Sequence, residues 1–164
     1  MTTETSNPSA EPAELEIVCS RTFAAPRELV FEAFSNPNHL IHWWGPKDFT
    51  NTFQEFDLRP GGAWRFVMHG PNGTDYPQVK DFVEVLAPGR IVFQHSQPLH
   101  NFQMAMTFAE HSGGTTLTWR MLFEASPHNA DLKSFIPTAN EQNFDRLEAY
   151  LEKLSPKRDR KSVV

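Results

Sequence analysis

Three polar side chains of this 164-residue chain are predicted to lie on the apolar faces of their segments, and they could act on a molecule held inside the protein. His95 and Asp81 each occur in a strand-like segment, and Asn140 falls one helical turn before Phe144. An imidazole and a carboxylate can exchange protons with a ligand, and an amide can orient one by hydrogen bonding. Convergent polar groups in an apolar pocket commonly provide specificity. A surface or purely structural role is the alternative for each of the three.

Other patterns that could support chemistry are weaker. His39 and His42 are three residues apart, a spacing that can bind a metal on a helix, but no acidic or thiol partner is near them in the sequence. The single Cys19 excludes an intrachain disulfide and a zinc site built on several thiolates. The chain has neither a Gly-x-Ser-x-Gly nucleophile motif nor a glycine-rich phosphate loop before a helix. We therefore predict no metal site and no cofactor.

The composition is that of a globular protein rather than a disordered one, with 39% hydrophobic and 21% charged residues. Phenylalanine and tryptophan are abundant, at 14 and 4 residues, and such bulky groups suit a pocket wall as well as a core. A net charge of -5 argues against a general nucleic-acid binder, which needs a basic face to contact phosphates. No segment approaches the roughly 20 apolar residues of a membrane span, so no membrane partner is expected.

The chain divides into a single domain with short flanking segments. Residues 1–14 are polar and contain two prolines, which predicts a flexible leader. They lack the basic start and apolar run of a signal peptide, so we expect a cytoplasmic protein. Residues 15–154 carry the hydrophobic patterns of one domain, and residues 155–164 are predicted to be a flexible basic tail.

Residues 15–23 alternate between apolar and polar side chains, which predicts a half-buried strand. Prolines at positions that favour helix starts then indicate two short helices, over residues 26–34 and 36–43. Six further strands are predicted, joined by short turns: 49–58, 63–69, 78–86, 91–95, 102–108 and 115–123. Short links favour antiparallel neighbours, because parallel strands need long crossovers.

The last element is predicted to be a helix with one apolar stripe: Phe144, Leu147, Leu151 and Leu154. Residues 138–141 match the capping-box pattern of a helix start. Pro137 marks either that start or a kink within a longer helix that begins near Asn129, and the sequence leaves both open.

Several local sequences carry a resemblance to a known family: 21–26 with 30–34, Trp43-Trp44-Gly45-Pro46, 59–68, 70–73 and 144–147. Together they resemble the bacterial branch of the START-like superfamily that is named after the activator of heat-shock-protein-90 ATPase homologue. The resemblance spans roughly residues 15–154. It implies an α+β helix-grip fold, in which a curved antiparallel sheet of about six or seven strands surrounds a long C-terminal helix, with two short helices after the first strand. Ligand binding is common across the superfamily, and chaperone activation belongs to some members.

One helix stripe cannot fill the concave face of a strongly curved sheet, so inward side chains near the open end should line a cavity. In several strands one set of alternating residues is uniformly large and apolar. Methionines in this set suit a pocket of variable shape. The predicted cavity-lining residues are Trp44, Phe53, Trp64, Phe66, Met68, Asp81, Phe93, His95, Met104, Met106, Trp119, Met121, Asn140 and Phe144. The alternative is that they simply form the core.

Three hypotheses for function follow. The first is non-covalent binding of a hydrophobic small molecule, lipid-, aromatic- or polyketide-like, in an internal cavity. The second is a chaperone-associated interaction module, as the resemblance implies. The third is a cyclase- or hydrolase-like enzyme that uses His95 or Asp81 on a cavity-bound ligand. Self-association into a homodimer, through a sheet edge or the face of the short helices, stays open.

Overall fold

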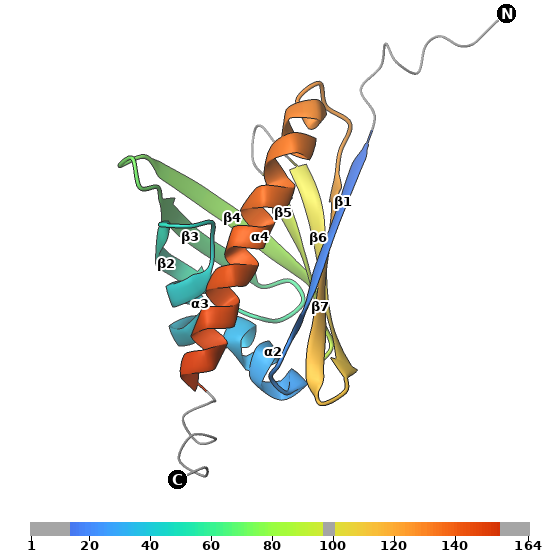
Figure 1. The fold of residues 1–164 in the computed structure, drawn as a ribbon. Coiled ribbons are helices and arrows are strands. Elements are labelled where there is room, and N and C mark those ends of the chain that lie inside the picture. The colour runs from blue at the N-terminus through green and yellow to red at the C-terminus, as the bar shows by residue number, and fades with distance from the viewer. Residues whose placement is uncertain (1–13, 97–100, 155–164) are drawn as a thin grey trace, which may run out of the picture.

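The computed structural model describes residues 14–96 and 101–154, so most of the predicted leader and the whole basic tail lie outside the described residues (Figure 1). The chain forms, in order, β1 (Leu15–Phe23), α2 (Arg27–Ser35), α3 (Pro37–Trp43), β2 (Thr50–Phe56), β3 (Ala63–His69), β4 (Asp75–Leu86), β5 (Arg90–Ser96), β6 (Asn101–His111), β7 (Gly114–Phe123) and α4 (Asn129–Leu154). Among the helices of this described part, none combines the length and apolar content that crossing a bilayer requires.

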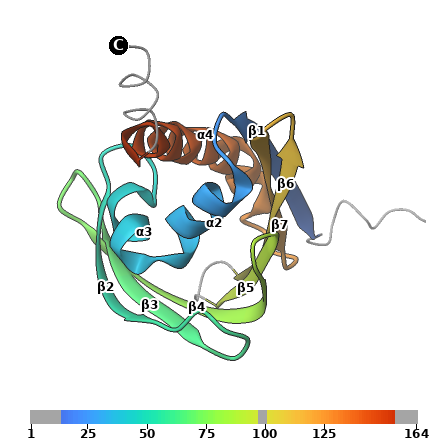
Figure 2. The same cartoon turned by 90° about the horizontal axis from the view of Figure 1, so that it is seen from below.

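The strands form one seven-stranded antiparallel sheet in the order β1-β7-β6-β5-β4-β3-β2. The sheet curves strongly, and Figure 2 shows α4 lying across its open side, with α2 and α3 inside one end. Each turn connects neighbours except the link from β1 to β2, which passes through the two short helices. The predicted α+β helix-grip architecture is confirmed.

The two short helices begin where the proline signals placed them. Pro26 precedes α2 in an extended conformation, and Asn36 caps α3 by accepting a hydrogen bond from the Asn38 backbone N–H at 2.9 Å. Trp43, at the end of α3, is 1% exposed and its Nε1 donates to the Ala33 carbonyl at 3.1 Å. The indole thus ties α3 to α2 and fixes where the chain leaves α3.

Helix α4 begins at Asn129 and contains Pro137, so the longer of the two predicted helices is correct and the capping-box pattern does not mark its start. The Asn129 side chain donates to the Glu124 carbonyl at 3.2 Å, and Leu132 in the first turns is buried. These contacts keep the segment before the proline helical, although proline removes one backbone hydrogen bond.

The apolar stripe of α4 faces the sheet as predicted. Phe144, Leu147 and Leu151 are buried, and Leu154 is half-buried at the end of the helix. The stripe therefore packs most tightly along the second half of α4.

An ion-pair network holds α4 against β1. The Arg21 guanidinium lies 2.7 Å from Glu141, 2.9 Å from Asp145 and 3.1 Å from Glu148, on consecutive turns of α4. Its Cζ also lies 5.5 Å from the centroid of the Phe144 ring. The pairing of one β1 cation with three helix carboxylates fixes the position of α4 over the sheet edge.

The predicted inward face of β4 is wrong. Asp81 is exposed, and so is Val83, which retains 50% of its accessible surface, whereas Lys80 and Phe82 are 3% exposed or less. The cause is the register with β5, in which Lys80 is opposite His95 and Phe82 is opposite Phe93. Directly opposed residues of antiparallel strands point to the same face, so the even-numbered residues here face the interior.

A register shift between Phe82 and Glu84 explains why the sequence pattern misled. After this bulge the alternation changes phase, and Val85 packs partly against the core while Val83 does not. A regular period of two cannot describe both ends of β4.

Candidate functional site

A cavity of about 130 Å³ lies between the concave face of the sheet, α4 and the segment that follows α3. Half of its lining residues are aromatic or methionine, and its polar groups are amides and one ammonium. The lining residues are Trp44, Gly45, Pro46, Met68, Gln78, Lys80, Phe93, Phe102, Met104, Trp119, Met121, Ala139, Asn140 and Asn143.

Half of the residues predicted to line a cavity lie in this wall: Trp44, Met68, Phe93, Met104, Trp119, Met121 and Asn140. They come from β3, β5, β6, β7, α4 and the residue after α3, elements that the sheet curvature brings together. Their contact with a ligand stays a prediction.

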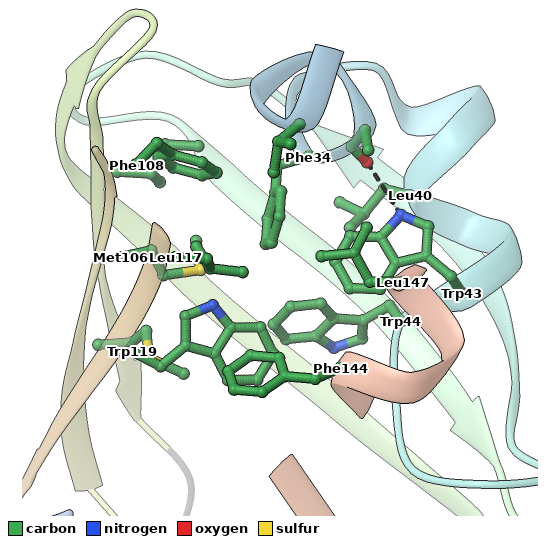
Figure 3. Close-up of a cluster of buried hydrophobic side chains, with 14 of the residues drawn as sticks. Phe34, Leu40, Trp43, Trp44, Met106, Phe108, Leu117, Trp119, Phe144 and Leu147 are labelled. Atoms are coloured by element: carbon green, nitrogen blue, oxygen red, sulfur yellow. Dashed lines mark hydrogen bonds between the residues drawn. The ribbon is translucent and has the colours of Figure 1, made fainter. Parts of the chain in front are cut away.

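The other predicted residues surround this wall without forming it. Trp64, Phe66, Met106 and Phe144 are at most 2% exposed and pack in the core, which is the alternative considered for them. Figure 3 shows Trp44, Trp119 and Phe144 with their rings in contact, with Met106 beyond them. His95 is also buried, Phe53 is half-buried, and Asp81 faces outward.

The outward position of Asp81 separates it from His95, which faces the interior from β5. The two residues named as acid–base candidates therefore lie on opposite faces of the sheet. A mechanism that needs both at one ligand is incompatible with this arrangement.

The sequence reasoning missed Lys80, the most unusual group in the cavity wall. Its Nζ lies 2.9 Å from His95 Nδ1 and 3.4 Å from the Gln78 Oε1. Four aromatic rings surround the ammonium, with centroids 4.9 to 5.9 Å from Nζ: Trp64, Phe66, Phe93 and Phe102. An ammonium that donates to Nδ1 places the neutral-imidazole proton of His95 on Nε2.

Burial lowers the pKa of Lys80 from 10.5 to about 7, because removal from water disfavours the charged form. Within residues 14–96 and 101–154 no Asp or Glu forms an ion pair with it. A sequence signal did exist, since Lys80 is in phase with Phe82, but Val79, Val83 and Val85 share the phase of Asp81 and favoured that face as the inward one.

Two amides of α4 face the cavity from the opposite side. Asn140 Nδ2 lies 3.5 Å from both Cys19 Sγ and Met121 Sδ, which are weak acceptors. Asn143 Nδ2 donates to the Trp43 carbonyl at 3.0 Å and is thereby fixed to the end of α3. Asn140 has therefore kept most of its hydrogen-bonding capacity for other acceptors.

Arg146 holds the segment that follows α3 and forms one side of the cavity. Its guanidinium donates to the carbonyls of His42, Trp44, Gly45 and Pro46 at 2.9 to 3.2 Å. Carbonyls at a helix end lack partners within the helix, and an arginine fork can satisfy several at once. Burial lowers the pKa of Arg146, and the nearby Asp48 opposes this change.

Gly45 within this segment has a φ of +107°, which side chains of L residues rarely adopt. A Cβ there would lie 2.8 Å from the Met68 Cε across the cavity wall. Glycine at this position thus allows the tight approach of the segment to β3.

Replacing Arg146 by methionine should lower the free energy of unfolding by about 2 to 3 kcal/mol, because four carbonyls, three of them in part-buried hydrogen bonds, lose a charged donor while the apolar stem is kept. Urea denaturation at pH 7 measures the change. Arg120→Met is the matched control, since Arg120 makes an exposed ion pair with Glu16 at 3.0 Å and its loss should cost less than about 1 kcal/mol. Equal effects of the two variants would contradict the structural role of Arg146.

His39 and His42 both face Tyr150 of α4. His39 Nδ1 lies 2.7 Å from the Tyr150 hydroxyl, and the His42 ring stacks on the phenol ring with centroids 6.1 Å apart. Glu32 lies 3.5 Å from His39 Nε2, an acidic neighbour that the linear sequence did not indicate. Across the described ranges no three His, Cys, Asp or Glu residues cluster in a way that could hold a metal ion.

Solved structures with the same fold include three bacterial proteins. A Nitrosomonas europaea protein has 23% identity and a TM-score of 0.77, covering 86% of this chain and 96% of its own. An Arthrobacter aurescens protein has 21% identity and a TM-score of 0.78, with 85% and 87% covered. A Mycobacterium smegmatis protein has 24% identity and a TM-score of 0.69, with 86% and 90% covered. These similarities concern the fold.

No curated protein matches the sequence significantly. The sequence profile described as "Activator of Hsp90 ATPase homolog 1-like protein" matches residues 24–152, which includes the short helices, β2 to β7 and most of α4. The chain therefore belongs to the family of Activator of Hsp90 ATPase homolog 1-like proteins.

Proposed function

We propose that this protein binds a small, largely apolar molecule non-covalently in the cavity beneath α4. The observation that carries the proposal is the space of about 130 Å³ that the apolar stripe of α4 leaves unfilled against aromatic and methionine side chains. An apolar cavity of about 150 Å³ is known to bind benzene. A single ring or a short acyl chain is therefore the size of ligand that fits.

The expected affinity is modest. An aromatic ring buries roughly 150–250 Å² of apolar surface. At about 25 cal/mol per Å² this contributes roughly 4–6 kcal/mol, which corresponds to dissociation constants from about 1 mM to about 40 μM before the cost of association weakens binding. Met68, Met104 and Met121 line the space, and their flexible side chains can enlarge it for a bigger ligand.

A variant that fills the cavity from α4 tests the proposal. Ala139 lies in the cavity wall, so Ala139→Leu should displace the ligand and weaken binding at least tenfold. Ala149→Leu adds the same side chain to an exposed position of the same helix and should leave binding unchanged. Ligand-observed NMR and native mass spectrometry with a library of single-ring aromatics and short acyl compounds provide the measurement.

If no compound binds, or if Ala139→Leu binds as well as the unmodified protein, the cavity is not the binding site. Thermal unfolding of both leucine variants shows whether the fold is retained.

The family description favours a second candidate, activation of the ATPase of a chaperone of the Hsp90 class in the cytoplasm. Such a role needs an exposed contact surface, and Phe135 on α4 is an apolar side chain with 61% exposure. An ATPase assay with the chaperone from the same organism tests this candidate, with Phe135→Ser as the variant. An unchanged ATPase rate in the presence of the protein excludes it.

A further inference from the structure

Lys80 places a cation in the cavity wall without a described carboxylate partner. The side chain is 3% exposed, and its described hydrogen-bond partners are an imidazole nitrogen and an amide oxygen. Among residues 14–96 and 101–154 no carboxylate pairs with it, although ten other ion pairs occur on this part of the chain. Buried lysines are otherwise almost always paired.

The surrounding rings compensate for the loss of water in part. Cation–π contacts contribute roughly 0.5–2 kcal/mol, whereas the effective cost of taking an ammonium out of water is several kcal/mol. An anion beside Nζ would supply the missing opposite charge and a strong charge-assisted hydrogen bond. Lys80 lines the cavity, so an anion bound in the cavity can lie beside Nζ.

We propose that the ligand of this cavity is a small carboxylic acid, aryl or short-chain acyl, bound as its anion with the carboxylate on Lys80 and its apolar body against Trp44, Met104 and Trp119. The proposal rests on the proposed small-molecule binding and gives that ligand a chemical class.

The other polar groups of the wall fit a carboxylate better than a neutral or cationic head group. Asn140 Nδ2 presently faces sulfur acceptors, and it can donate to a carboxylate oxygen. The Gln78 side chain in the same wall offers a further amide N–H. With one cation and about 130 Å³, the cavity matches a singly charged head group and one ring rather than a phosphate dianion on a larger molecule.

Carboxylate binding should be accompanied by proton uptake near pH 8. A ligand anion beside Lys80 favours the ammonium and raises its pKa from about 7. The described groups that face Nζ are Trp64 and Phe66 from β3, Gln78 from β4, His95 and Phe93 from β5 and Phe102 from β6, and of these His95 is the other ionisable group.

Matched pairs of acid and primary amide isolate the charge of the ligand. Benzoate against benzamide and hexanoate against hexanamide differ little in size and apolar area. We expect each acid to bind at least tenfold more tightly than its amide at pH 6.5, measured by calorimetry or ligand-observed NMR. In Lys80→Met this preference should disappear, so that acid and amide bind with similar affinity. Lys47→Met removes an exposed lysine beside Pro46 and should keep the preference.

The outcomes separate the two proposals. If acid and amide bind equally to the unmodified protein, the carboxylate proposal is wrong and small-molecule binding stands. If neither pair nor any other compound binds, small-molecule binding fails as well. A preference that persists in Lys80→Met overturns the role of Lys80.

The unmodified protein gives a test that needs no variant. The preference for the acid should decline as the pH rises above about 7, because the free protein then loses the Lys80 proton that the complex must take up, whereas amide binding should stay constant. Calorimetry in two buffers of different ionisation enthalpy should detect proton uptake with the acid and none with the amide at pH 8. A constant preference up to pH 10 contradicts the proposal.

Discussion

Lys80→Met should make the ligand-free protein more stable at pH 6.5, by an amount on the order of 4 kcal/mol. Methionine keeps the length of the apolar stem and contacts the same four rings, but it carries no charge that must be desolvated. Replacing a buried ionic group by a well-packed apolar one is often stabilising. Urea denaturation of the two proteins at pH 6.5 measures the gain.

The pH dependence distinguishes desolvation of Lys80 from a general packing effect. Because burial lowers the pKa of Lys80 from 10.5 to about 7, the unfolded chain binds more protons than the folded one between these values. The destabilisation is complete below about pH 7 and is relieved as the pH rises toward 10.5. The unmodified protein should therefore gain about 3 kcal/mol relative to Lys80→Met between pH 6.5 and pH 9.5.

Lys47→Met is the control, because Lys47 is exposed and its loss should leave the pH profile of the unmodified protein unchanged. Parallel profiles for Lys80→Met and the unmodified protein would show that the ammonium is not desolvated in the folded state. A group kept at such a cost in stability is expected at a binding site rather than in a structural core.

Phe144→Ala should destabilise the fold by about 4 kcal/mol, because a phenyl ring removed from a closed core leaves a cavity. The ring is 0% exposed and joins three parts of the fold. Its centroid lies 4.8 Å from that of Trp119 on β7 and 6.1 Å from that of Phe23 on β1, both in edge-to-face contact. Figure 3 shows the ring directed from α4 onto Trp119.

Phe135→Ala applies the same substitution to a residue of the same helix that is 61% exposed, and it should change stability by less than about 0.5 kcal/mol. Denaturation in guanidinium with tryptophan fluorescence compares the two variants. Similar effects of both would mean that α4 does not pack across the sheet by its Phe144 face, and the cavity beneath it would then lose one wall.

The inward face of a strand was predicted correctly where only one of its two alternating sets of residues is large and apolar. In β3, β6 and β7 one alternating set is large and apolar, as in Trp64 and Phe66, and most of these residues are buried, with Met68 and Phe102 half-buried. The stripe of α4 and the proline-marked short helices are equally clear in the sequence, because caps, prolines and a helical period act over a few neighbouring residues. Local signals of this kind, with the resemblance, were enough for the helix-grip fold.

The sequence by itself determined which segments become strands and helices and that their large apolar faces meet, since burial of those faces dominates folding. The tertiary structure alone decided which side of β4 faces inward, because strand register and a bulge depend on β5 rather than on β4. It therefore also decided that Lys80 and not Asp81 lies in the wall, next to His95. The pKa of Lys80 has the same origin: desolvation is produced by residues far apart in the chain that surround one ammonium.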